Sequence, residues 1–237
     1  MTPYQTLIFK EVKSMKIELH THTKESSPCS KTDAAQIVRL YKGAGYDAIV
    51  ITDHYNKWCM EQMGAASSEE YNEYVLSGYE TAKKAAGNEL LILPGIEVTL
   101  LESPNDYLLY GITKDFLYEN PYIYNLSLDE LHELCIKNNI LLIQAHPKRA
   151  YCNPAPLEFI DGMEVYNGNP RHNSHNEKVY DIAKNNDLIM TSGSDFHQTD
   201  DLARGGIITD TDITNISELT DILKTSAYKL IFNGEYK

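Results

Sequence analysis

Short apolar runs alternate with amphipathic segments along most of the chain, and this alternation constrains the fold more than any other feature. The runs over 48–52 and 140–145 are almost continuously apolar, which is typical of strands buried on both faces of a sheet. Between such runs, apolar residues spaced three and four apart predict a helix over 34–44, with Thr32 or Asp33 as its N-cap. Strands that alternate with helices predict a parallel sheet with right-handed crossovers.

The same patterns assign an element to most of the remaining chain. Two capping-box patterns, Ser67 with Glu70 and Ser127 with Glu130, predict the starts of two helices. We find no internal repeat, low-complexity tract or linker, so we expect a single domain. The further predicted elements are strands over 17–22, 90–93, 107–112, 162–166, 188–191, 205–208 and 229–232, and helices over 174–186 and 216–223.

Histidine, aspartate and glutamate residues follow the carboxyl ends of five predicted strands. His20 and His22 lie one residue apart at the end of the first strand, and alternate strand residues share a face, so both imidazoles can reach one metal ion. In a closed barrel such strand ends converge where active sites form, whereas in an open doubly wound sheet they are spread along an edge. Five ligand-bearing ends therefore favour a barrel. The other residues of the set are Asp53, His54, Glu97, His146, Asp195 and His197.

Imidazole nitrogens and carboxylate oxygens together are the ligands of hydrolytic sites that hold Zn²⁺, Mn²⁺ or Fe. The set is too large for one ion, so we expect two or three divalent ions, with Glu97 as a bridging ligand. Two ions about 3.5–4 Å apart can hold a hydroxide between them and stabilise the entering and leaving oxygens of a displacement at phosphorus. Phosphoester hydrolysis is therefore the first chemical hypothesis.

Charge and composition narrow the class of partner. The formal net charge is −13, so we expect no nucleic-acid partner and no anionic membrane surface. A phosphorylated substrate would be repelled at long range unless bound cations reverse the sign inside the site. The four cysteines are dispersed, and we find neither a signal-peptide pattern nor an apolar span of about 18 residues. We expect a soluble cytoplasmic protein with one domain over 1–237, in which residues 1–15 form an extra strand or arm.

The predicted ligands lie in five short motifs. As an ordered set spread over about 16–206, they resemble the motifs of the PHP superfamily, which is named for its polymerase and histidinol-phosphatase members. The resemblance implies a distorted (β/α)7 TIM-like barrel with a di- or trinuclear metal centre that hydrolyses phosphoester bonds. The motifs are His20-Thr21-His22, Thr52-Asp53-His54, Gly95-Ile96-Glu97, Ala145-His146-Pro147 and Gly193-Ser194-Asp195-Phe196-His197.

The resemblance also implies how the ligands divide among the ions. His54 and His197 resemble ligands of a second ion, and Glu97 with His146 those of a third. Asp53 would orient a histidine or the local turn. The implied ligands of the first ion are His20, His22, Glu97 and Asp195.

Two positions depart from the pattern of the superfamily. Ser27 and Pro28 stand where many members carry a further ligand of the second ion. Cys29 or Glu25 are candidates to replace it, and the alternative is that the ion lacks this ligand. Free cysteine is commonly buried, so burial of Cys29 is the alternative expectation. Many members also have a histidine on the strand after the glutamate, where Asp106 is the evident carboxylate here.

Basic residues follow the ligand motifs on the same predicted face. Lys148, Arg149, Arg171 and Arg204 are therefore candidates to bind substrate phosphate, because a guanidinium can hold phosphate oxygens in a bidentate way. His172, close to a predicted helix start, is expected to be solvated.

These inferences predict a metal-dependent phosphoesterase that hydrolyses a small-molecule phosphomonoester by a metal-bridging hydroxide. Glu97, Asp195, His197 and Arg171 are its expected catalytic residues, and both histidinol phosphate and nucleotide phosphates are candidate substrates. A non-catalytic metal-binding regulatory or structural module is one alternative. An amidohydrolase-like enzyme acting on C–N bonds is another, although such barrels usually carry a bridging lysine or carbamate that we cannot place in this sequence.

Overall fold

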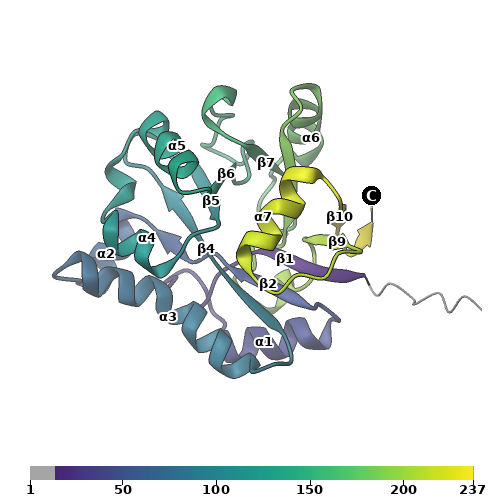
Figure 1. Cartoon of the computed structure of the whole chain (residues 1–237), viewed down its shortest axis with the longest axis horizontal. Coiled ribbons are helices and arrows are strands. Elements are labelled where there is room, and N and C mark those ends of the chain that lie inside the picture. Colours follow the sequence, from purple (N-terminus) through teal and green to yellow (C-terminus); the bar gives the residue numbers. More distant parts are fainter. Residues whose placement is uncertain (1–13, 237) are drawn as a thin grey trace, which may run out of the picture.

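A computed structural model describes residues 14–236 and shows a curled sheet surrounded by helices (Figure 1). The strand order is β11-β10-β9-β1-β2-β4-β5-β6-β7-β8, with β3 beside β4. The strands are β1 (Met15–Thr21), β2 (Ala48–Ile51), β3 (His54–Tyr55), β4 (Leu91–Thr99), β5 (Asp106–Tyr110), β6 (Leu141–Gln144), β7 (Gly162–Asn167), β8 (Ile189–Gly193), β9 (Ile207–Thr209), β10 (Lys229–Phe232) and β11 (Glu235–Tyr236). The predicted strand or arm over 1–15 lies almost entirely outside the described residues.

The helices connect the strands and pack outside the sheet (Figure 1). Within residues 14–236, no helix combines the length and the apolar character needed to cross a membrane. The helices are α1 (Ala34–Gly43), α2 (Lys57–Met63), α3 (Ser68–Ala86), α4 (Lys114–Glu119), α5 (Leu128–Lys137), α6 (Asn176–Asn185) and α7 (Ile216–Thr225), with 3-10 turns at Ile123–Asn125, Leu157–Phe159 and Thr199–Asp201.

Capping residues start the helices where the sequence predicts. The Asp33 carboxylate accepts a hydrogen bond from Gln36 N at 2.7 Å, which satisfies a free amide at the start of α1. The predicted apolar face of this helix is buried, and α1 packs against α3. At α5 the capping box is complete, since Ser127 and Glu130 each accept from the backbone of the other. These local signals are confirmed.

Strand direction departs from the expected parallel sheet. β1, β2 and β4 are parallel to one another, as are β6, β7 and β8, but β5 is antiparallel to both β4 and β6. The connection over 100–105 is too short to hold a crossover helix, so the chain must reverse direction. β9 and β10 are also antiparallel to their neighbours. The expectation of a uniformly parallel sheet is therefore wrong. The number of strand–helix units that a (β/α)7 barrel implies stays a prediction.

The curl of the sheet brings β8 back towards β1. Thr21 and Phe196 form an isolated parallel bridge, and the main chain of Phe196 donates to His20 O at 3.2 Å and accepts from His22 N at 2.9 Å. These bonds join the end of the first strand to the loop after β8. As a result, ligand motifs that are more than 170 positions apart in the sequence share one end of the sheet.

Candidate metal centre

The predicted ligands come together near the carboxyl ends of β1, β2, β4, β6 and β8. Imidazoles and carboxylates are costly to bury unless they are paired or bind metal. Most of these side chains are nevertheless buried, and only His54 and His197 are partly exposed. The residues that the structure gathers here are His20, His22, His54, Glu97, His146, Asp195 and His197.

The first cluster has the spacing of ligands around a single ion. His20 Nε2 lies 3.0 Å from His22 Nε2 and 3.2 Å from Glu97 Oε1. His22 Nε2 lies 3.3 Å from Glu97 Oε2, and Asp195 Oδ1 lies 3.5 and 3.4 Å from the two imidazole nitrogens. Four atoms that each sit about 2.0–2.1 Å from a tetrahedral Zn²⁺ are about 3.3 Å apart. The donor set therefore fits a divalent ion.

Glu164 orients His20 from behind the cluster. Its Oε1 accepts from His20 Nδ1 at 2.8 Å, which leaves the lone pair on Nε2 directed at the other ligands. Its Oε2 accepts from His146 N at 3.0 Å and from Asn167 Nδ2 at 2.9 Å. One buried carboxylate thus ties β7 to β1 and to the loop after β6. Our sequence reasoning missed Glu164, although a charged residue inside the apolar run over 162–166 was an available signal.

The second cluster is formed by the imidazoles of His22, His54 and His197, whose ring nitrogens lie within 4.8 Å of one another. His54 Nδ1 lies 2.9 Å from Glu97 Oε2 yet makes no hydrogen bond, as expected of two ligands that face a common ion. Burial, followed by the positive charges of His54 and His197, holds the pKa of His22 well below its ordinary value.

Cys29 lies beside this second cluster and is exposed, so the alternative expectation of burial is wrong. Partial burial would raise its pKa, but hydrogen bonds to the imidazoles of His197 and His54 lower it to about 6. The other candidate, Glu25, lies elsewhere: both its oxygens accept from Ala34 N, at 3.0 and 3.1 Å, at the start of α1. The structure therefore brings Cys29 to the site and leaves Glu25 outside it.

The third cluster joins Glu97, Asp106 and His146. His146 Nε2 lies 3.1 Å from Glu97 Oε1 and 3.7 Å from Asp106 Oδ2. Asp106 is the first residue of β5 and is paired with Thr99 near the end of β4. Only an antiparallel β5 brings its first residue to this end of the sheet, so the unexpected strand direction places this carboxylate.

Asp53 supports the loop after β1. Its carboxylate accepts from Thr23 N at 2.6 Å, from Thr23 Oγ1 at 2.7 Å and from Ser27 Oγ at 2.7 Å. Burial raises the pKa of Asp53 to about 6, although these donors oppose the rise. The predicted orienting role agrees with these contacts, since Ser27 in turn accepts from His54 N at 3.1 Å.

Opposite charges balance one another inside the centre. Burial disfavours the ionised form of Glu97, but the imidazoles of His20 and His54 hold its pKa well below the ordinary value. Burial acts likewise on Asp195, where the Arg149 guanidinium and His20 hold the pKa well below its ordinary value. Carboxylates that stay ionised beside imidazoles are ready to exchange the imidazole protons for metal ions.

Backbone conformation at two ligands is strained. His146 and Asp195 have positive φ values of 31° and 50°, which non-glycine residues adopt at a cost of about 1–3 kcal/mol. Next to Asp195, a Cβ added to Gly193 would lie 2.4 Å from the Cβ of His20 and 2.6 Å from Glu164 Oε1. A glycine is therefore required for β8 to approach β1 at this point.

A cavity of about 310 Å³ opens over the three clusters. Arg149 lines it and donates from Nη2 to Asp195 Oδ2 at 2.5 Å and to Asn167 Oδ1 at 2.8 Å. Arg171 also lines it and forms a bidentate ion pair with the fully buried Asp201. Residues of the lining that sequence reasoning had not assigned to the site are Lys31, Asn169, His172 and Gln198.

Two of the four predicted phosphate-binding residues are not part of this lining. Lys148 is half-buried outside the cavity. Arg204 donates to Asp200 O at 2.9 Å and to Asn233 Oδ1 at 3.1 Å, so its guanidinium is held away from the ligands. The expectation for both residues is wrong, because a position after a ligand motif does not determine which way a long side chain points. His172, expected to be solvated, does line the cavity.

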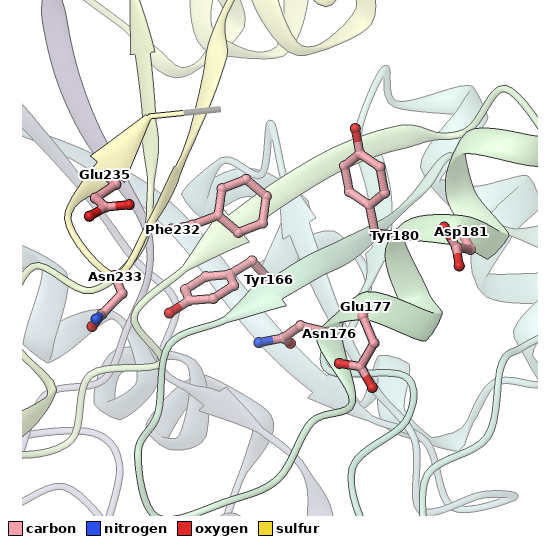
Figure 2. Close-up of a pocket in the computed structure, with 8 residues that line it drawn as sticks. All are labelled: Tyr166, Asn176, Glu177, Tyr180, Asp181, Phe232, Asn233 and Glu235. Atoms are coloured by element: carbon pink, nitrogen blue, oxygen red, sulfur yellow. The ribbon is translucent and has the colours of Figure 1, made fainter.

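A larger hollow of about 630 Å³ lies elsewhere, between α6, β7 and the β10–β11 hairpin (Figure 2). The rings of Tyr166 and Phe232 meet edge to face with centroids 4.8 Å apart, and Glu177 and Asp181 lie along α6. None of the clusters with metal-binding geometry found among the described residues lies there. The chemistry suggested by the sequence is therefore concentrated in the smaller cavity.

Comparisons with known proteins agree with this architecture. A two-domain protein from Bacteroides vulgatus ATCC 8482, containing a predicted PHP-like metal-dependent phosphoesterase, is 15% identical with a TM-score of 0.67, over 94% of this chain and 66% of that one. PsfC from Pseudomonas syringae PB-5123 is 14% identical with a TM-score of 0.68, over 93% and 92%. The lesion-specific endonuclease PfuEndoQ from Pyrococcus furiosus is 16% identical with a TM-score of 0.61, over 92% and 58%. No curated protein matches the chain.

These identities are low, so the solved structures show a shared fold and no more. The chain also spans slightly under two thirds of the Bacteroides protein and less of the endonuclease. A model of the PHP domain, by contrast, matches residues 18–224. That range includes all seven clustered ligands, and the chain therefore belongs to the PHP domain family.

Proposed function

We propose that the protein is a metal-dependent phosphoesterase that hydrolyses a phosphomonoester of a small molecule in the cavity over the three clusters. The observation that carries the proposal is the position of Glu97. Its Oε1 faces His20 and His146, and its Oε2 faces His22 and His54. A single buried carboxylate that faces imidazoles of every cluster is suited to bridge neighbouring ions, as polynuclear hydrolases require.

The residues divide into metal-holding and substrate-holding groups. His20, His22, Glu97 and Asp195 would hold one ion, His54 and His197 a second, and Glu97 with His146 and Asp106 a third. Bound divalent ions of zinc, manganese or iron would supply an activated water and stabilise negative charge at phosphorus.

Arg149 and Arg171 would hold phosphate oxygens, because both line the cavity and both are fixed by carboxylates. Arg149 bonds to Asp195 and Arg171 to Asp201. Their orientation is therefore set before substrate binds, which lowers the entropic cost of binding. Asn169 also lines the cavity and donates to Asp195 O at 3.2 Å, which further fixes the loop after β8.

The size and charge of the site favour a small substrate. About 310 Å³ is at the lower end of ligand pockets, which usually span about 300–1,000 Å³. The net charge of −13 disfavours long nucleic acids, although one similar fold belongs to a lesion-specific endonuclease. An amidohydrolase-like reaction is less favoured, because such enzymes usually carry a bridging lysine or carbamate and the three clusters are built from histidine, glutamate and aspartate.

The proposal is tested by phosphate release from a panel of phosphomonoesters and phosphodiesters. The protein is loaded in turn with Zn²⁺, Mn²⁺ and Fe²⁺ and compared with Glu97→Gln and with Arg204→Ala. We expect release from monoesters that Glu97→Gln abolishes and that Arg204→Ala leaves unchanged. Cleavage of diesters alone would contradict the substrate class, and full metal loading without any turnover would favour the binding-module alternative.

A further inference from the structure

We propose that Asp201 is a positioning residue for the hydrolysis. Its carboxylate fixes the Arg171 guanidinium relative to the loop that carries His197, and it thereby sets where a substrate phosphate lies against the second ion. The inference deepens the proposed function and rests on it. It assigns a task to a fully buried carboxylate that holds no ion in the proposed centre.

Four donors from two loops meet at the Asp201 carboxylate. Its two oxygens accept from Arg171 Nη1 and Nη2 in a bidentate pair, the second bond at 2.9 Å. Oδ2 also accepts from His197 N at 2.9 Å and from Gln198 N at 3.0 Å. Arg171 follows β7, whereas His197 and Gln198 follow β8. One buried charge therefore ties the side chain of one loop to the main chain of the other.

The main chain of Arg171 is anchored to the loop after β8 by a separate contact. Asn169 Oδ1 accepts from Arg171 N at 3.1 Å, and Asn169 Nδ2 donates to Asp195 O at 3.2 Å. The Arg171 side chain is 35% exposed, so without Asp201 its long stem would be free to take other rotamers in solvent. Asp201 thus holds the end of a side chain whose base Asn169 already fixes.

The bidentate pair leaves donors of Arg171 for a substrate. A guanidinium has five N–H groups, and Asp201 accepts from one on each terminal nitrogen. Arg171 and His197 line the same cavity. A phosphate in that cavity would therefore meet the other N–H groups of Arg171 and the ion proposed at His197 together. A guanidinium that left its place would lose these contacts with the phosphate.

Arg149, the other arginine of the cavity, is held in a different way. Its Nη2 donates to Asp195 Oδ2, and Asp195 is itself a proposed ligand of the first ion. Asp201 holds no ion in the proposed centre, so its grip on Arg171 does not depend on metal loading. Loss of this grip should therefore weaken substrate binding while the ions stay in place.

Asp201→Asn removes the grip on Arg171 and spares the loop. The asparagine oxygen can still accept from His197 N and Gln198 N, but its NH₂ group would face the guanidinium. On the phosphomonoester that the parent chain hydrolyses fastest, KM should rise by roughly 10-fold, with little change in kcat or in metal content. Asp200→Asn removes the same charge from an exposed neighbour and should match the parent chain.

Two further variants separate positioning from charge and from a merely structural role. Arg171→Lys keeps a positive charge beside Asp201 but cannot form the bidentate pair, so its KM should also rise by roughly 10-fold. When Asp201→Asn is added to Arg171→Ala, KM should be no higher than in Arg171→Ala alone, because no guanidinium remains to be held. Circular dichroism confirms that each variant is folded, and Arg171→Lys decides alone if Asp201→Asn is not.

The outcomes distinguish the inference from the proposed function. An unchanged KM in Arg171→Lys, or a KM in the double variant raised by the product of the two single effects, would overturn the inference alone. Loss of metal or of kcat in Asp201→Asn at an unchanged KM would do the same, since the carboxylate would then support only the loop of His197. A metal-loaded parent chain that releases no phosphate from any monoester would overturn the inference and the proposed function together.

Discussion

At the residue scale, the centre depends on partners that hold each ligand in one orientation. Glu164 shows this most clearly, because its two oxygens accept hydrogen bonds from His20 Nδ1, His146 N and Asn167 Nδ2. All three partners are donors, so only a carboxylate satisfies them together. The tautomer of His20 and the course of the loop after β6 therefore rest on the same buried charge.

Replacing Glu164 by glutamine should weaken metal binding. The NH₂ group of the new side-chain amide would face a donor, either His20 Nδ1 or His146 N, so one ligand loses its support. We expect metal affinity to fall by about 10–100-fold, measured by competition with a chromophoric chelator. Glu158→Gln, at an exposed position, is the matched control and should bind like the parent. Equal affinities in the two variants would contradict the orienting role.

Truncation of Arg171 tests the substrate-holding group. Its charge-assisted bonds to phosphate would contribute about 1.5–3 kcal/mol, so Arg171→Ala should raise KM by roughly 10–100-fold with little change in kcat. Arg204→Ala removes an equal charge from a side chain that points elsewhere and should leave both parameters unchanged. Steady-state kinetics on the best monoester measures both. An unaltered KM in Arg171→Ala would place that guanidinium outside the substrate site.

The sequence alone revealed the candidate metal ligands at the strand ends. It did not reveal which side chains hold those ligands in place. His20 and His22 follow an apolar run, and the same local signal marks His54, Glu97 and His146. Glu164 meets His20 across 144 positions, and no local pattern encodes such a contact. For the same reason the ion pair that fixes Arg171 on Asp201 appears only in the folded chain.

At the scale of elements, helix α3 supports the loop that carries the first ligands. Gly78 faces that loop closely: a Cβ there would lie 2.1 Å from Thr23 Oγ1 and 2.3 Å from Asp53 Oδ2. Gly78 N also donates to Ser26 Oγ at 2.9 Å. The absence of a side chain therefore lets the helix pack directly against the loop after β1.

An alanine at position 78 should consequently destabilise the fold. Overpacking of a fully packed contact costs about 1–3 kcal/mol, so the free energy of unfolding of Gly78→Ala should fall by about that amount in urea. Gly43→Ala is the matched control in α1, because a Cβ there meets nothing within 4 Å and alanine favours the helix by up to about 1 kcal/mol. If both variants lost stability equally, the close contact at Gly78 would not be the cause.

Long elements with caps were predictable, and short elements and strand directions were not. α1 and α5 begin at the residues that their capping signals indicate. α2 and α4 span only Lys57–Met63 and Lys114–Glu119, which is too short for a helical period to stand out. The direction of β5 depends on the length of the connection before it, and its apolar pattern alone does not reveal that direction.

At the scale of the whole molecule, an acidic chain concentrates buried carboxylates around one centre. Glu97, Glu164 and Asp195 are all buried there and are balanced in part by His20 and Arg149. A ligand that binds the folded chain and not the unfolded one stabilises the fold by mass action. Bound ions should therefore contribute to stability as well as to chemistry.

Chelation should accordingly lower the melting temperature. At free metal 100-fold above its Kd, one site adds about 2.7 kcal/mol, equivalent to roughly 5–10 °C for a chain of this size. Thermal unfolding followed by circular dichroism, over a range of metal concentrations, measures the effect. Added metal should raise the melting temperature of His20→Ala much less than that of the parent chain. A Tm that does not respond to metal in the parent chain would argue against a buried centre.

The central claim is that one cavity holds a polynuclear metal centre that hydrolyses phosphomonoesters. The most direct test is elemental analysis of metal-loaded protein, freed of loosely bound ions, alongside phosphate release from the same sample. The account predicts about two or three ions per chain and release that chelation abolishes and added metal restores. One ion or none, with no phosphate released from any substrate of the panel, would contradict it.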